Sequence, residues 1–149
     1  MNSQKKMWVL LILAAILMVV LSGCSGLPKT AKVSISFDPN PVPYSSENER
    51  WLFDIVLDES NGIGVDLSSI KLDSYNQEDE LIDTTIWYEA DEEEITSLFG
   101  SNYLPAFSSI QGIASHHNTT FKYTILSIEG VDDDGNPVEV IGRVDFLSQ

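Results

Sequence analysis

Polar and apolar residues alternate along several short segments of the chain after residue 30. Strict alternation with a period of two residues predicts a β-strand that buries one of its faces. The clearest segment is 51–58, in which Trp51, Phe53, Ile55 and Leu57 fall on one face. Further strands are predicted at 32–37, 67–75, 81–88, 120–129 and 138–147, with a short one at 110–114.

One segment breaks this rhythm and predicts a short helix. Residues 91–94 are all acidic, and a glycine follows at Gly100. Between them, Ile95, Leu98 and Phe99 recur at the spacing of one helical face. Acidic side chains favour the first turn of a helix and glycine commonly ends one, so we expect a single short helix with a solvated, acidic start.

Turn-forming residues separate the predicted strands. Three prolines fall within 38–43, two glycines within 59–64, and an acidic, glycine-centred loop joins the last two strands at 130–137. Proline cannot donate to a strand ladder, and glycine and aspartate tolerate turn conformations. Seven or eight short strands with one short helix predict an all-β fold, an antiparallel β-sandwich, over 31–149.

Several of these segments also resemble a known class of module. Residues 37–43, 51–65, 98–100 and 130–138 are similar to strand ends and turns of immunoglobulin-like or fibronectin-III-like modules in bacterial secreted and surface proteins. The resemblance implies an immunoglobulin-like sandwich. It implies no particular activity, because such modules serve many roles.

The first 23 residues have the layout of a secretory signal peptide. Lys5 and Lys6 precede an uninterrupted apolar run at 7–21, and the small residues Ser22 and Gly23 follow it. The alternative is a spanning helix, but a run of 15 residues is shorter than the ~20 that cross a bilayer core. We therefore expect cleavage after this segment.

The only cysteine of the chain follows this run directly. The sequence Leu21-Ser22-Gly23-Cys24 resembles the lipobox of bacterial lipoproteins. The resemblance implies that Cys24 carries a diacylglyceryl group on its sulfur and an acyl chain such as palmitate on its amine, and that 24–30 is a lipidated tether. Two or three acyl chains anchor a protein stably, whereas one does not. The alternative is a secreted protein with a free thiol.

The net charge of the chain limits the kinds of molecule that it can bind. The whole chain has 8 basic and 23 acidic side chains, a formal charge of -15. Removal of 23 residues, Lys5 and Lys6 among them, leaves 126 residues with 6 basic and 23 acidic side chains, a formal charge of -17. Nucleic acid is excluded as a natural partner, because phosphate binding needs clusters of Lys and Arg.

The acidic loop near the C-terminus raises the possibility of a calcium site. Asp132, Asp133, Asp134 and Asn136 supply the oxygen ligands that calcium prefers. An EF-hand frame fails, because alignment on Gly135 places Gly130 and Ile141 where carboxylates are needed. The alternative is a polar hairpin tip in which the aspartates only shape the turn.

Two further groups of residues have side chains that can take part in chemistry. His116 and His117 suggest zinc or proton transfer, but neighbours in an extended segment point in opposite directions, and we read both as loop residues. Ser115 lies beside them without the Gly-x-Ser-x-Gly elbow of a hydrolase. We expect no catalytic residues, no resident metal and no cofactor.

The large aromatic residues suggest a different ligand. Trp51, Trp87, Tyr88 and Tyr103 could form a platform on which sugars stack. Core packing is the competing interpretation for both tryptophans, since both lie in predicted strands.

These observations lead to one expectation and one alternative. We expect a non-enzymatic interaction or structural module, held outside the cytoplasm at the cell membrane or outer membrane by lipidated Cys24, with an envelope protein as its partner. The alternative is a surface module that binds glycans or calcium.

Overall fold

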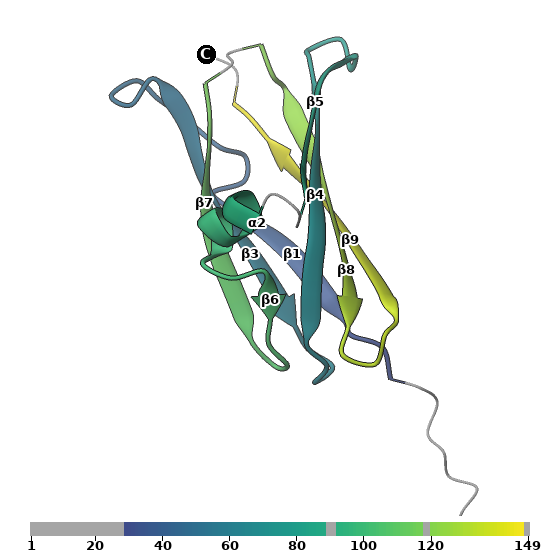
Figure 1. Cartoon of the computed structure of the whole chain (residues 1–149). Helices are drawn as coiled ribbons and strands as arrows, with labels where there is room; N and C mark the ends of the chain where they lie inside the picture. The colour runs from purple at the N-terminus through teal and green to yellow at the C-terminus, as the bar shows by residue number, and fades with distance from the viewer. Residues whose placement is uncertain (1–28, 89–91, 118–119, 148–149) are drawn as a thin grey trace, which may run out of the picture.

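The computed structural model describes residues 29–88, 92–117 and 120–147, which form two antiparallel β-sheets packed face to face (Figure 1). The elements, in chain order, are β1 (Val33–Asp38), β2 (Tyr44–Ser45), β3 (Arg50–Glu59), β4 (Val65–Tyr75), β5 (Leu81–Tyr88), α2 (Glu92–Phe99), β6 (Tyr103–Leu104), β7 (Ser109–His116), β8 (Tyr123–Asp132) and β9 (Pro137–Asp145). This confirms the predicted all-β sandwich with one short helix: seven strands have six or more residues, and β2 and β6 have two each.

The strands of the described part of the chain form two sheets. In the first sheet β3 is central, with β1 and β2 along one side and β7 along the other. In the second sheet the order is β5-β4-β8-β9, and β6 continues the β5 side of β4. Every pairing between these strands is antiparallel.

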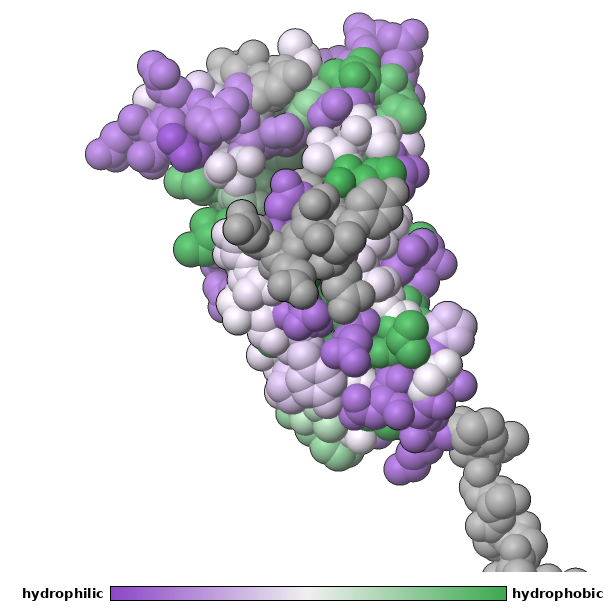
Figure 2. Space-filling model, viewed as in Figure 1, coloured by the Kyte–Doolittle hydropathy of each residue, from purple (hydrophilic) through white to green (hydrophobic). Residues whose placement is uncertain are grey.

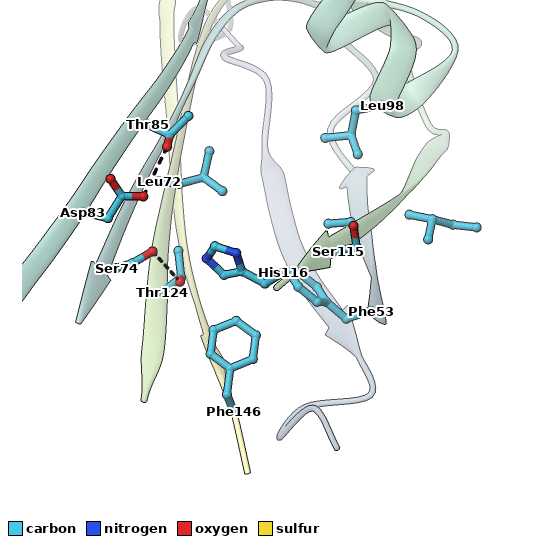
Figure 3. A pocket seen from close by; sticks show the side chains of 12 residues that line it. Phe53, Leu72, Ser74, Asp83, Thr85, Leu98, Ser115, His116, Thr124 and Phe146 are labelled. Atoms are coloured by element: carbon cyan, nitrogen blue, oxygen red, sulfur yellow. Dashed lines mark hydrogen bonds between the residues drawn. The ribbon is translucent and has the colours of Figure 1, made fainter. Parts of the chain in front are cut away.

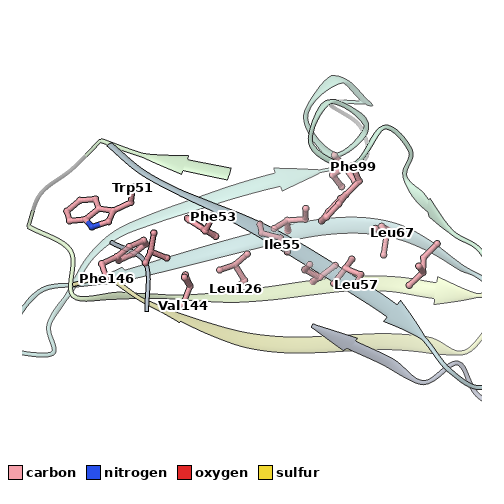
Figure 4. Packing of buried hydrophobic residues seen from close by; sticks show 14 of the residues in the cluster. Trp51, Phe53, Ile55, Leu57, Leu67, Phe99, Leu126, Val144 and Phe146 are labelled. Carbon is pink, nitrogen blue, oxygen red and sulfur yellow. The ribbon is translucent and has the colours of Figure 1, made fainter. Parts of the chain in front are cut away.

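The core lies between the sheets and follows the predicted alternation. On β3 the side chains of Trp51, Phe53, Ile55 and Leu57 are all 5 % exposed or less, which confirms the face assigned to them (Figure 4). Strands of the facing sheet contribute further core residues, among them Leu67, Ile70, Leu126, Ile128 and Val144. Each such side chain contributes roughly 1.5–3 kcal/mol when fully buried.

One side of the sandwich is closed by the segment that follows β1, around Val42. The backbone N–H of Val42 donates to the Asp145 carbonyl at 2.7 Å, and the N–H of Leu147 donates to the Val42 carbonyl at 2.9 Å. These bonds form a parallel bridge between Val42 and Phe146 just beyond β9. The segment after β1 therefore covers the β9 edge of the second sheet.

The opposite side of the sandwich lies between β5 and β7, and α2 fills part of it. Ile95 and Phe99 of α2 reach the core and are 1 % and 8 % exposed. Leu98 packs on β7 at Gly112, where a Cβ atom would come 2.5 Å from the Leu98 carbonyl oxygen. The helix predicted from Ile95, Leu98 and Phe99 thus plugs the gap between the sheets.

Several predicted element limits were wrong in detail. The strand predicted at 110–114 extends over Ser109–His116, because all eight residues pair with β3. The strand predicted from residue 120 begins at Tyr123 and continues to Asp132, which leaves a shorter hairpin tip. The last strand ends at Asp145 rather than at residue 147. No helix of the described part of the chain is long and apolar enough to cross a membrane.

Candidate functional site

A pocket of about 300 Å³ opens between the sheets on the β5–β7 side, beyond the end of α2 (Figure 3). Its apolar wall comes from Phe53 of β3, Leu72 of β4, Leu98 of α2 and Phe146. Volumes of this size and a mainly apolar lining are typical of small binding pockets. Through Leu98, α2 borders this pocket in the gap between β5 and β7.

Polar groups from three strands of the second sheet line the same pocket. Ser74 of β4 and Thr124 of β8 share a hydrogen bond of 2.9 Å, and both side chains are buried. On β5, the Thr85 hydroxyl donates to the Asp83 carboxylate at 3.5 Å. Hydroxyls and a carboxylate on an apolar wall provide directional contacts for a ligand.

His116 lies on the first-sheet side of the pocket, at the end of β7. It was predicted to be a loop residue, and this was wrong, because His116 pairs with Trp51 and is half-buried. Its ring lies 4.2 Å from the Phe121 ring centroid and 5.9 Å from that of Phe146. Burial lowers the pKa of His116, against the opposing effect of Asp83. His117 directly follows the last residue of β7 and is exposed.

The charge of the pocket is negative. Asp83 is its one acidic lining residue, and none of the described ion pairs involves this carboxylate. Within the described residues, no hydrogen bond joins His116 to Ser74, Thr124 or Asp83. The arrangement therefore offers shape, hydroxyl groups and one negative charge to a bound group.

The acidic hairpin tip between β8 and β9 is held together by its own side chains. Asp132 is 4 % exposed, and its Oδ1 accepts hydrogen bonds from the backbone N–H of Asp134 and of Asn136 at 3.1 and 2.8 Å. The Asn136 amide donates to both Asp132 oxygens at 3.1 Å. Among the described residues, no group of three or more His, Cys, Asp or Glu side chains is placed to hold a metal ion. The hydrogen bonds of the Asp132 carboxylate shape this turn.

Asp133 links the hairpin tip to the turn before β4 and to β6. Its carboxylate accepts a hydrogen bond from the Gly64 N–H at 3.1 Å and from the Tyr103 hydroxyl at 3.1 Å. The hydrogen bond to Asp133 raises the pKa of Tyr103. Tyr103 therefore serves as a partner of the hairpin tip in this structure.

Glu59 organises the neighbouring turn, although no sequence pattern singled it out. This buried carboxylate accepts hydrogen bonds from five backbone N–H groups, those of Lys32, Asn61, Gly62, Ile63 and Phe107. Burial by itself would raise the pKa of Glu59, but the backbone hydrogen bonds outweigh it and lower the pKa to about 2. Glu59 therefore ties together three segments at one end of the sandwich.

The remaining predicted site residues divide into two groups. Trp51 is 1 % exposed and packs against Tyr44 and Phe146, so it belongs to the core and to no exposed platform. The backbones of Trp87 and Tyr88 lie in β5, and their side chains are outside the described part of the structure. Cys24 and the 1–23 leader also lie outside the described residues, and their roles stay predictions.

The strand arrangement defines the class of this protein. Strands β1, β3 and β7 occupy the places of A, B and E in one sheet, and β4, β5, β8 and β9 those of C, C′, F and G in the other. The chain is an immunoglobulin-like β-sandwich module with a helix between the C′ and E positions.

Comparison with known proteins adds only distant structural similarity. No family model matches the chain, and no curated protein sequence is similar to it. A protein described as ApaA from Bordetella pertussis is 12 % identical, with 81 % of this chain and 98 % of that chain covered and a TM-score of 0.48. A CARDB domain from Pyrococcus furiosus, solved in complex with di-metal ions, is 13 % identical, with 79 % and 88 % covered and a TM-score of 0.38. The sandwich class rests on the strand pairing of this chain alone.

Proposed function

We propose that this protein is a lipid-anchored module of the cell envelope that acts outside the cytoplasm through contact with another protein and has no enzymatic activity. The diacylglyceryl group on Cys24 would hold it at the membrane, and the sandwich would present the contact surface. The observation that supports this most is the way the sandwich holds the segment that leads back toward Cys24.

Three hydrogen bonds fix that segment at one end of the molecule. The Ala31 N–H donates to Asp132 Oδ2 at 3.0 Å, and the Lys32 N–H donates to Glu59 Oε1 at 3.1 Å. The Asn61 amide donates to the Thr30 carbonyl at 2.6 Å. The chain thus leaves the sandwich beside the β8–β9 hairpin tip (Figure 1).

This geometry would orient the module on a membrane. The six residues 25–30 span about 20 Å at full extension, so the hairpin-tip end would face the lipid. The opposite end, with the β2–β3 and β4–β5 turns, would face away from it. Figure 2 shows hydrophilic residues gathered on these two turns, which contain Glu47, Glu49, Glu78, Asp79 and Glu80.

Cell fractionation tests the anchor. Cys24→Ala removes the only thiol that could accept the lipid, so the variant should leave the detergent phase on Triton X-114 partition, while Ser25→Ala should stay in it. Retention of the Cys24→Ala variant at the wild-type level in the detergent phase would contradict the proposed anchor.

Photocrosslinking in intact cells tests the contact with a partner. A crosslinking residue is placed in turn at exposed positions on the β2–β3 turn, on β5 and on β9. We expect a discrete protein adduct that disappears when Cys24→Ala is combined with the crosslinking position. Absence of an adduct from every face, or a hydrolytic activity abolished by one point substitution, would contradict the proposed function.

A further inference from the structure

The free edge of the second sheet is β5. Among the described residues β5 pairs with β4 alone, so its outer side has no strand partner. Leu81, Ile82 and Ile86 on this strand are 53 %, 42 % and 40 % exposed. By contrast, the other edge strand, β9, is covered near its end by the segment around Val42.

The backbone of an unpaired edge strand is a place where a further strand can add to a sheet. Edge strands are commonly protected by lysine, proline or an inward-pointing charge, because their free N–H and C=O groups pair readily with another strand. In β5 the only charged residue is Asp83, and it lines the pocket between the sheets (Figure 3). Asp83 is thus the one inward-pointing charge of this edge, and a strand that pairs with β5 has to neutralise it; on the outer face Ile82 and Ile86 are exposed.

The pocket lies directly beside this edge. Asp83 and Thr85 of β5 form part of its wall, and Phe53, Leu72 and Phe146 form its apolar floor. In an added strand, alternate side chains point to the same face of the sheet. A segment paired with β5 would consequently direct every second side chain toward the pocket, which is how strand addition obtains specificity.

The negative charge of Asp83 favours a basic side chain of the added strand in the pocket. Asp83 is the one acidic group of the pocket and has no ion-pair partner among the described residues, and the chain as a whole carries a formal charge of -15. A long basic side chain can lay its aliphatic stem on apolar surface while its charged head reaches a carboxylate. Lysine and arginine have this form.

We propose that β5 accepts an extended segment of a partner protein as an added strand, with one lysine or arginine side chain of that segment in the pocket against Asp83. This inference rests on the proposed function, because it names the surface and the chemistry of the same protein contact.

Selection from a peptide library tests the inference without knowledge of the partner. A displayed library of random ten-residue peptides is selected on the full-length protein in detergent micelles. We expect binders with Lys or Arg at one position, flanked by alternating β-branched residues. Hydrogen exchange should slow in β5 when such a peptide is bound, and β9 should not change. A library that yields no binder, or binders without a basic residue, overturns the inference.

Matched variants make the test specific. Asp83→Asn should lower the affinity for the selected peptide roughly tenfold. Replacement of the basic residue of the peptide by Glu should lower the affinity to a similar extent. Glu139→Gln on β9 removes an exposed carboxylate from the opposite edge strand and should leave affinity unchanged. Alternate N-methylation of the peptide should abolish binding. Unchanged affinity after Asp83→Asn or after N-methylation overturns the inference, whether or not the Asp83→Asn variant self-associates.

The crosslinking experiment separates this inference from the proposed function. Ile82 on β5 and Ile141 on β9 are exposed isoleucines on the two edge strands of one sheet, at 42 % and 59 %. An adduct from Ile82 that the selected peptide competes away supports the inference. Adducts from Ile141 alone keep the proposed function and overturn the β5 site, whereas adducts from neither position, nor from the β2–β3 turn, overturn both.

Discussion

The buried Glu59 carboxylate accepts hydrogen bonds from backbone N–H groups of three separate segments. Its two oxygens accept five N–H groups from the β1 start, the turn after β3 and the β6–β7 loop. A charged acceptor makes stronger hydrogen bonds than a neutral one, and an unsatisfied buried donor costs about 1–3 kcal/mol. The Glu59 side chain therefore holds three segments of the chain together.

Glu59→Gln should destabilise the protein by about 3 kcal/mol, because the amide keeps one oxygen acceptor and turns the other into a donor among N–H groups. The free energy of unfolding from urea denaturation measures the effect. Glu139→Gln is the matched control, since Glu139 is exposed on β9, and should change stability by less than about 0.5 kcal/mol. Equal effects of the two substitutions would contradict the role given to Glu59.

The same residue should make stability depend on pH. The pKa of Glu59 in the folded protein is about 2, below its ordinary value of 4.5. Its contribution is complete above pH 4.5 and is lost as the pH falls from 4.5 toward 2, because the unfolded state binds the proton first. The difference in unfolding free energy between wild type and Glu59→Gln should shrink over this window. A constant difference from pH 6 to pH 2.5 would count against the lowered pKa.

The sequence predicts a turn at Glu59, but it does not predict the hydrogen bonds that the Glu59 carboxylate accepts. Asn61 and Gly62 mark 59–64 as a turn, and the structure has one there. Two of the donors, Lys32 and Phe107, lie 27 and 48 residues away along the chain. Such contacts depend on the strand pairing of the whole sandwich, which local patterns do not specify.

At the scale of elements, α2 lies at the open side of the sandwich, between β5 and β7. The helix places Ile95 and Phe99 in the core, and its Leu98 lies against the one β7 position without a side chain, Gly112. A Cβ atom there would come 2.5 Å from the Leu98 carbonyl oxygen, which is part of the backbone and cannot rotate away. The helix and β7 can pack closely only because of this glycine.

Gly112→Ala should therefore move α2 away from β7 and cost about 2 kcal/mol, within the range of overpacked sites. Thermal unfolding of the variant measures the loss. Ser115→Ala on the exposed part of β7 is the control and should lie within about 0.5 kcal/mol of wild type. A stable Gly112→Ala protein would show that the contact between α2 and β7 is looser than described.

Elements with strong alternation were predictable, and those defined by distant partners were not. On β3, Trp51, Phe53, Ile55 and Leu57 fall on the buried face that their spacing indicates. His116 was misplaced because β7 continues to it only through pairing with Trp51. The pocket was not predictable either, since Asp83, Thr124 and Phe146 are brought together by strands far apart in the sequence.

On the scale of the whole molecule, the sandwich has two ends with different roles. Asp132, Asp133 and Glu59 hold the loops and the incoming chain at one end. Acidic turns occupy the other, and the pocket beside β5 opens on the side between them. A short tether to a membrane would leave both the distant end and the β5 edge accessible to another protein.

The central claim, a lipid-anchored envelope module, depends on the chemistry of Cys24. Mass spectrometry of the N-terminal peptide from protein extracted with membranes tests it most directly. The account predicts a chain that begins at Cys24 and carries a diacylglyceryl group on the sulfur. A chain that keeps residues 1–23, or one that begins elsewhere with an unmodified Cys24, would contradict it.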